Sequence, residues 1–136
     1  MLETFIEQLG NELEIQDLIV ITEPGHYKIP FEDDIEVEAL RNNEGEYAFK
    51  AIIGPLPKEK VDFFIARAME ANLFGKGTLG SAIGLDEEAK LLTLSMEVDY
   101  NSSYNEWRDK LEDFINSIDF WRKESLNLNV PLKKPR

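Results

Sequence analysis

The residues of this chain that could do chemistry fall into a few short strings, of which one resembles a nucleotide-binding loop. Gly75-Lys76-Gly77-Thr78-Leu79-Gly80 spells the G-x-G-x-x-G pattern of dinucleotide sites. Such a loop needs a strand before it and a helix after it, so that the pyrophosphate meets the positive end of the helix dipole. Here the string follows a predicted helix and enters a predicted strand. We therefore interpret it as a helix stop and a loop, and we predict no cofactor.

Two runs of carboxylates and a single histidine are the remaining candidates for catalysis or metal binding. The acids within residues 32–36 and 86–88 could run hydrolysis or hold Mg²⁺ or Ca²⁺. Neither run has EF-hand spacing, and residues 99–110 start like such a loop but end on a lysine. His26 lies beside a Pro-Gly turn, and the chain has no second histidine and no cysteine. We predict solvated turns, no metal and no catalytic residue; a small carboxylate-dependent enzyme using Glu32–Glu36 stays as an alternative.

Composition restricts the classes of partner. The chain has 136 residues, which fits one domain, and its 15 Lys+Arg against 27 Asp+Glu give a net charge of −12. This charge disfavours binding to nucleic acid and to anionic membranes. The lack of cysteine removes disulfides and the common zinc sites. The sequence has neither a long apolar run nor a basic, apolar leader, so the cytoplasm is the expected location.

Hydrophobic periodicity predicts an α+β domain with the order helix, three strands, helix, two strands, helix (α-β-β-β-α-β-β-α), in which helices pack on an antiparallel sheet. Ser103-Tyr104-Asn105-Glu106 matches a capping box at the start of the last helix. One face of this helix is predicted to be apolar: Trp107, Leu111, Phe114, Ile115, Ile118 and Trp121. The apolar run within residues 16–22 is either an extra strand or a link. The domain covers residues 1–126, and the basic tail at 127–136 is expected to be flexible. The predicted elements are 1–13, 25–31, 35–40, 47–53, 58–74, 79–85, 91–98 and the helix from Ser103.

The apolar surface carries the clearest functional signal. The three helices have more apolar side chains than one five-stranded sheet needs, so they either share a single monomer core or leave part of this surface for partners. We assign a dimer contact to the second helix: Val61, Phe63, Phe64, Arg67 and Ala68. We assign the binding of another protein to the first helix, through Leu2, Phe5, Ile6 and Leu9. Weaker candidates for this binding lie on the strands: Ile29, Phe31, Ile35 and Val37.

Several strings spread over the chain resemble one family. They are FIEQLG at 5–10, GHYKI at 25–29, AIIGPLP at 51–57, MEANLFG at 69–75, Gly80, and IGLD at 83–86. Over residues 2–122 the chain resembles the class I specialised chaperones of bacterial type III secretion, the CesT-like family. The matching residues are packing and turn residues, and the basic tail has no counterpart that we can place.

This resemblance implies a cytoplasmic homodimer of a Gram-negative bacterium, without enzymatic activity. Such a chaperone binds the extended N-terminal region of one or a few effectors, keeps it soluble and secretion-competent, and can gain a strand from it. The secretion ATPase is a further candidate partner, because stripping the client needs an external motor. A rival interpretation is an acidic immunity or antitoxin-like protein that neutralises a folded basic toxin.

The assignment of Phe5 to a client groove makes a direct prediction. Phe5→Asp should abolish client binding while the dimer survives in size-exclusion chromatography. An unfolded variant would mean that Phe5 belongs to the core.

Overall fold

The structure, a computed structural model, describes residues 2–32, 34–56, 61–74, 81–86, 88 and 90–129. Side chains at 61, 71–74 and 126–129 are not among the described ones. The elements are α1 (Leu2–Leu13), β1 (Val20–Glu23), β2 (His26–Pro30), β3 (Glu36–Arg41), β4 (Tyr47–Pro55), α2 (Val61–Phe74), β5 (Ala82–Leu85), β6 (Leu91–Val98) and α3 (Tyr104–Asn129).

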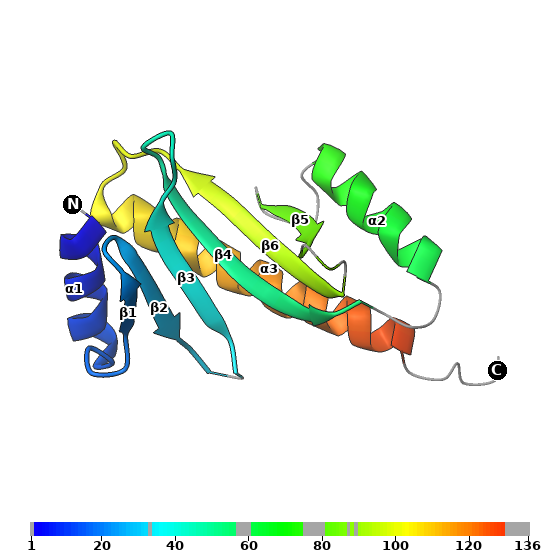
Figure 1. Ribbon diagram of the computed structural model, residues 1–136, viewed down its shortest axis with the longest axis horizontal. Helices are drawn as coiled ribbons and strands as arrows, with labels where there is room; N and C mark the ends of the chain where they lie inside the picture. Colours follow the sequence, from blue (N-terminus) through cyan, green and yellow to red (C-terminus); the bar gives the residue numbers. More distant parts are fainter. Residues whose placement is uncertain are drawn as a thin grey trace.

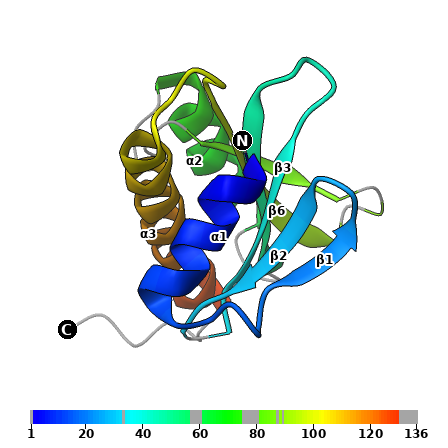
Figure 2. The ribbon, with the colours of Figure 1, turned by 90° about the vertical axis from the view of Figure 1, so that its left-hand side faces the viewer.

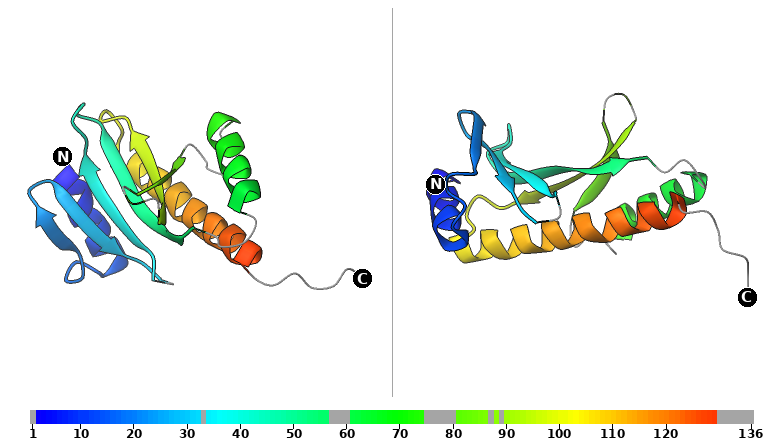
Figure 3. Two further views of the ribbon diagram at one scale, coloured as in Figure 1. Left: turned by 45° about the vertical axis from the view of Figure 1, so that its right-hand side comes forward. Right: turned by 90° about the horizontal axis from the view of Figure 1, so that it is seen from below.

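The strands form a six-stranded antiparallel sheet in the order β1-β2-β3-β4-β6-β5 (Figure 1). The long α3 runs beneath one face of this sheet, and α1 crosses the same side at its β1–β2 end (Figure 3). α2 lies at the opposite end, near β5 and the last turns of α3 (Figures 1 and 3). Figure 2 shows α1 in front of α3, with β1 and β2 beside it.

The predicted α+β order is confirmed, with one addition. The apolar run at 16–22 contains β1, whose Val20 and Ile21 pair with Lys28 and Tyr27 of β2. α3 continues to Asn129 and so includes residues 127–129 of the predicted tail. Residues 130–136 lie outside the described residues.

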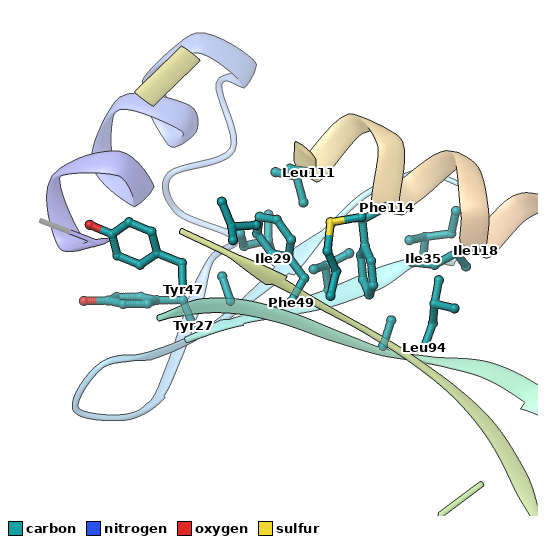
Figure 4. Close-up of a cluster of buried hydrophobic side chains, with 14 of the residues drawn as sticks. Tyr27, Ile29, Ile35, Tyr47, Phe49, Leu94, Leu111, Phe114 and Ile118 are labelled. Atoms are coloured by element: carbon teal, nitrogen blue, oxygen red, sulfur yellow. The ribbon is translucent and has the colours of Figure 1, made fainter. Parts of the chain in front are cut away.

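The core lies between α3 and the inner face of the sheet (Figure 4). The Phe49 ring on β4 packs against Trp107 and Phe114 of α3, with centroids 5.4 and 5.6 Å apart. β6 alternates between buried and more exposed positions, as a strand covered on one face must. The predicted apolar face of α3 is therefore confirmed. Ile115 is partly buried against the core, and the other five residues are buried: Trp107, Leu111, Phe114, Ile118 and Trp121.

The N-terminus of α3 has the capping box that the sequence predicts. The Glu106 backbone N donates to Ser103 Oγ at 3.2 Å, and the Ser103 backbone N donates to Glu106 Oε1 at 2.8 Å. Each side chain satisfies an amide that the first helical turn leaves free. The box fixes where the chain leaves β6 and enters the helix that covers the sheet.

The C-terminus of α1 determines how the chain reaches β1. Glu14 takes a left-handed conformation with φ 57°, and the Ile15 amide donates to Gly10 O at 3.0 Å, which closes a Schellman-type end. The returning link then passes close to Gly10: a Cβ there would lie 3.2 Å from Gln16 Cα and 3.3 Å from Ile19 Cδ1. Glycine at this position lets the link lie directly on the helix.

Gly10→Ala tests this close approach. Replacing glycine by alanine inside a helix normally stabilises a protein by about 0.5–1 kcal/mol. Here we expect the free energy of unfolding to fall by about 1 kcal/mol, because the backbone at Gln16 must shift. Urea denaturation measures it, with the exposed Gln8→Ala on the same helix as control, expected within about 0.5 kcal/mol of wild type. A more stable Gly10→Ala protein would contradict the close packing.

Candidate protein-binding site

The α1 residues assigned to a client belong to the core of the single chain. Leu2, Phe5, Ile6 and Leu9 are all buried, and Phe5 is only 7% exposed. The Phe5 ring packs against Tyr47, Tyr104 and Trp107 with centroids 5.5 to 5.7 Å apart. These contacts correct the expectation for Phe5→Asp: the variant would place an unpaired charge among aromatic rings, so loss of the fold would precede any specific loss of client.

The strand residues assigned to the client divide between the core and the surface. Ile29 and Val37 pair across β2 and β3 and are fully buried, and Ile35 is buried as well. Phe31 is half-buried and lies just beyond β2. The sequence could not make this division, because the same apolar residue types occur in the core and in a groove.

An apolar hollow, here called the end groove, opens between the link after α1, the end of β2 and the middle of α3. Its volume is about 720 Å³. Phe31 and Ile35 are the two predicted client residues that line it. Its rim is charged, since Lys123 pairs with Asp119 at 2.8 Å. The other lining residues are Leu13, Ile15, Leu18, Pro30, Glu32, Ile115 and Asn116.

A second hollow, the side groove, lies between α1 and β1 and has a volume of about 240 Å³. Ile21 of β1 and Ile19 of the link before it form its strand wall. Ile21 stays 65% exposed although its pairing partner Tyr27 is buried. The helix wall and floor are Glu3, Ile6, Glu7, Gln16 and Tyr27. α1 therefore covers the inner side of β2 and leaves that of β1 open.

The link and β1 contain the groove residues that sequence reasoning missed. Leu18 is 58% exposed in the end groove, and Ile21 lies in the side groove. The signal in the sequence was the run Leu18-Ile19-Val20-Ile21. An edge strand covered on one face buries only every second side chain, so four consecutive apolar residues leave some of them exposed. The outer edge of β1 has no neighbouring strand in the described part of the chain.

α2 has apolar side chains on both sides of the stripe that it buries. Phe64 and Ala68 are buried, with the Phe64 ring 5.8 Å from that of Trp121. Phe63 and Met69 are 56% and 65% exposed. Arg67 forms an ion pair with Glu124 of α3 at 2.9 Å. Of the residues assigned to a dimer contact, Phe63 and Arg67 therefore lie at the surface, Phe64 and Ala68 pack within the chain, and the Val61 side chain is not described.

Asp86 and His26, two of the polar residues considered for catalysis or metal binding, contact other groups of the chain. Asp86 Oδ1 accepts from the Lys90 and Leu91 amides at 2.9 and 3.1 Å, and these backbone hydrogen bonds lower the pKa of Asp86. His26 Nε2 and Nδ1 lie 3.3 Å from Glu23 and 3.4 Å from Glu38.

Over the described ranges, no three histidine and carboxylate side chains come together as a metal site, and no helix is long and apolar enough to cross a membrane. The G-x-G-x-x-G string at 75–80 lies outside the described residues, as do Asp33 and Glu87 of the two acidic runs. The string falls between α2 and β5, an element order that does not suit a nucleotide.

Together, the helix-backed sheet, its open edge and the two apolar grooves define a small protein-binding module. The model of the Tir chaperone protein (CesT) family matches residues 4–122, so the chain belongs to this family. A curated relative, the Chlamydia pneumoniae protein CPj0713/CpB0740, is 28% identical over 123 residues, which cover 89% of this chain and 93% of that protein.

Solved structures with the same fold include chaperones bound to partners. The Yersinia pestis type III secretion chaperone SycH, in complex with a stable fragment of YscM2, gives a TM-score of 0.64 at 18% identity, over 92% of this chain and 97% of that chain. The HopA1–SchA chaperone–effector complex gives 0.68 at 15% identity, over 89% and 92%. At these identities the likeness is one of fold.

Replacing Phe5 distinguishes core from groove. We expect Phe5→Ala to lower the free energy of unfolding by about 3–5 kcal/mol, because it removes a buried ring and leaves a cavity. Ile21→Ala, at a largely exposed site, should change it by less than about 1 kcal/mol. Urea denaturation of both variants makes the comparison, and equal losses would show that the two side chains are buried alike.

Proposed function

We propose that this protein is a cytoplasmic, non-enzymatic chaperone of a Gram-negative bacterium that binds the extended N-terminal segment of a type III secretion effector and keeps it soluble and secretion-competent. The observation that carries the proposal is the pair of apolar grooves on either side of the link that leads into an open strand edge. The family and the chaperone–partner complexes with this fold support it.

Two shallow hollows suit an extended client better than a folded one. An unfolded segment loses about 1–2 kcal/mol per residue that becomes ordered. Burial of each Leu- or Phe-sized side chain returns about 1.5–3 kcal/mol. Anchors in the end groove and the side groove, with backbone pairing at β1 between them, can therefore hold a segment that would otherwise stay disordered. A folded toxin domain would instead require one broad complementary patch.

Homodimerisation and client release complete the proposal. Phe63 and Met69 flank the buried stripe of α2, and neither lines a groove, so a second copy could cover them. The chain's G-x-G-x-x-G string has the wrong element order for a nucleotide, so release needs an external motor, for which the secretion ATPase is the candidate partner.

Leu18→Asp tests the end groove. The side chain is exposed, so the fold should survive, but a client anchor would now meet an unpaired charge. We expect affinity for the co-purifying client, identified by mass spectrometry, to fall by at least about tenfold, equivalent to about 1.4 kcal/mol. Tyr100→Asp, at an equally exposed apolar site in another loop, is the matched control and should bind normally.

The proposal also specifies the state of the client. Limited proteolysis of the complex should show protection of a continuous, extended N-terminal segment. Protection of a compact folded domain would favour the immunity-protein alternative, and equal loss of binding in both loop variants would exclude the end groove.

Phe63→Glu combined with Met69→Glu tests the α2 contact. We expect light scattering to give the mass of a dimer for the wild type and of a monomer for the variant, because two charges cannot be buried unpaired in an interface. Leu18→Asp is the control and should remain dimeric. A monomeric wild type would contradict the homodimer.

A further inference from the structure

The helix wall of the side groove carries two carboxylates without an ion-pair partner among the described residues. Glu3 and Glu7 lie one turn apart on α1, on the same flank of the helix beside Ile6, and both are exposed. The other polar groups that line the groove, Gln16 and Tyr27, are neutral. The groove thus combines an apolar floor with a wall of uncompensated negative charge.

The charge of Glu3 reaches the floor of this groove. Burial raises the pKa of Tyr27, and the negative charge of Glu3 raises it further. A second carboxylate at Glu7 extends the same field along the helix. An entirely apolar occupant would partly remove water from both carboxylates, which costs free energy. A cation on the occupant would offset this desolvation cost by pairing with them.

The strand wall indicates the form of the occupant. Ile21 faces the same side of the sheet as its buried partner Tyr27, yet no described residue covers it. A client strand added to the free edge of β1 would place every second side chain on this side, about 6.8 Å apart. One such side chain would cover Ile21, and the next would reach the α1 wall.

We propose that the side groove selects client segments with the pattern apolar-x-basic, in either direction. The apolar side chain packs on Ile21, and the aliphatic stem of a lysine or arginine lies over Ile6 with its cation beside Glu3 and Glu7. This inference rests on the proposed function and adds to it the charge of the client at one position.

Peptide probes test the selection directly. Two fluorescein-labelled peptides are titrated with the full-length protein, and their affinities are measured by fluorescence anisotropy. One is Ser-Thr-Ile-Thr-Lys-Thr-Ile-Thr-Ser, and the other is the same peptide with Glu in place of Lys. We expect the lysine peptide to bind at least about tenfold more tightly, with a smaller difference at high salt. Glu3→Gln with Glu7→Gln should remove most of this preference, and Glu3→Lys with Glu7→Lys should reverse it.

A matched control separates the local effect from net charge. Glu88→Gln with Glu112→Gln removes two exposed carboxylates elsewhere and should keep the preference. Urea denaturation confirms that each variant is folded. Equal affinity of the two peptides for the wild type, an equal effect of the control variant, or no binding of either peptide would overturn this inference. The proposed function is judged separately, by the co-purified client and Leu18→Asp.

Discussion

The packing of α3 against β4 and β6 is the constraint on which the rest of the structure depends. One helical face, with two tryptophans and Phe114, fills the inner side of the central strands. At 26 residues, α3 is about 39 Å long, so it supports the sheet from the α1 end to the α2 end. The two shorter helices can then each take one end of the sheet without having to cover the whole of it.

The position of α1 follows from this arrangement and explains the grooves. α1 is held to the start of α3 by Glu12, which accepts from the Tyr104 hydroxyl and pairs with Arg108 at 3.3 Å. The Phe5 ring inserts between Tyr104, Trp107 and Tyr47 on the same side. A helix fixed at this point covers β2 but not β1, and its end at Leu13 stops short of Phe31. The uncovered margins are the side groove and the end groove.

The sequence predicted the elements well because their signals are local. The capping box at Ser103 and the apolar face of α3 both follow from spacing along the chain, and the structure confirms them. The residues that line the grooves could not be predicted in the same way. Phe5 and Leu18 are both large and apolar, and only the tertiary packing makes the first a core residue and leaves the second in a groove. α2 shows the same limit, since Phe64 is buried and the adjacent Phe63 is exposed.

The two sides of α1 would let one short helix serve both the fold and the proposed binding. Its central stripe, with Phe5 and Leu9, is needed to close the core and is therefore unavailable to a client. Glu3 and Glu7 are exposed outside that stripe, where changes affect the groove and not the packing. Because a client would contact α1 itself only at this margin, the charge pattern there can vary without loss of the fold. Under the proposed function, selectivity among effectors would therefore reside in exposed polar residues of α1, while the affinity would come from apolar side chains of the link and β1.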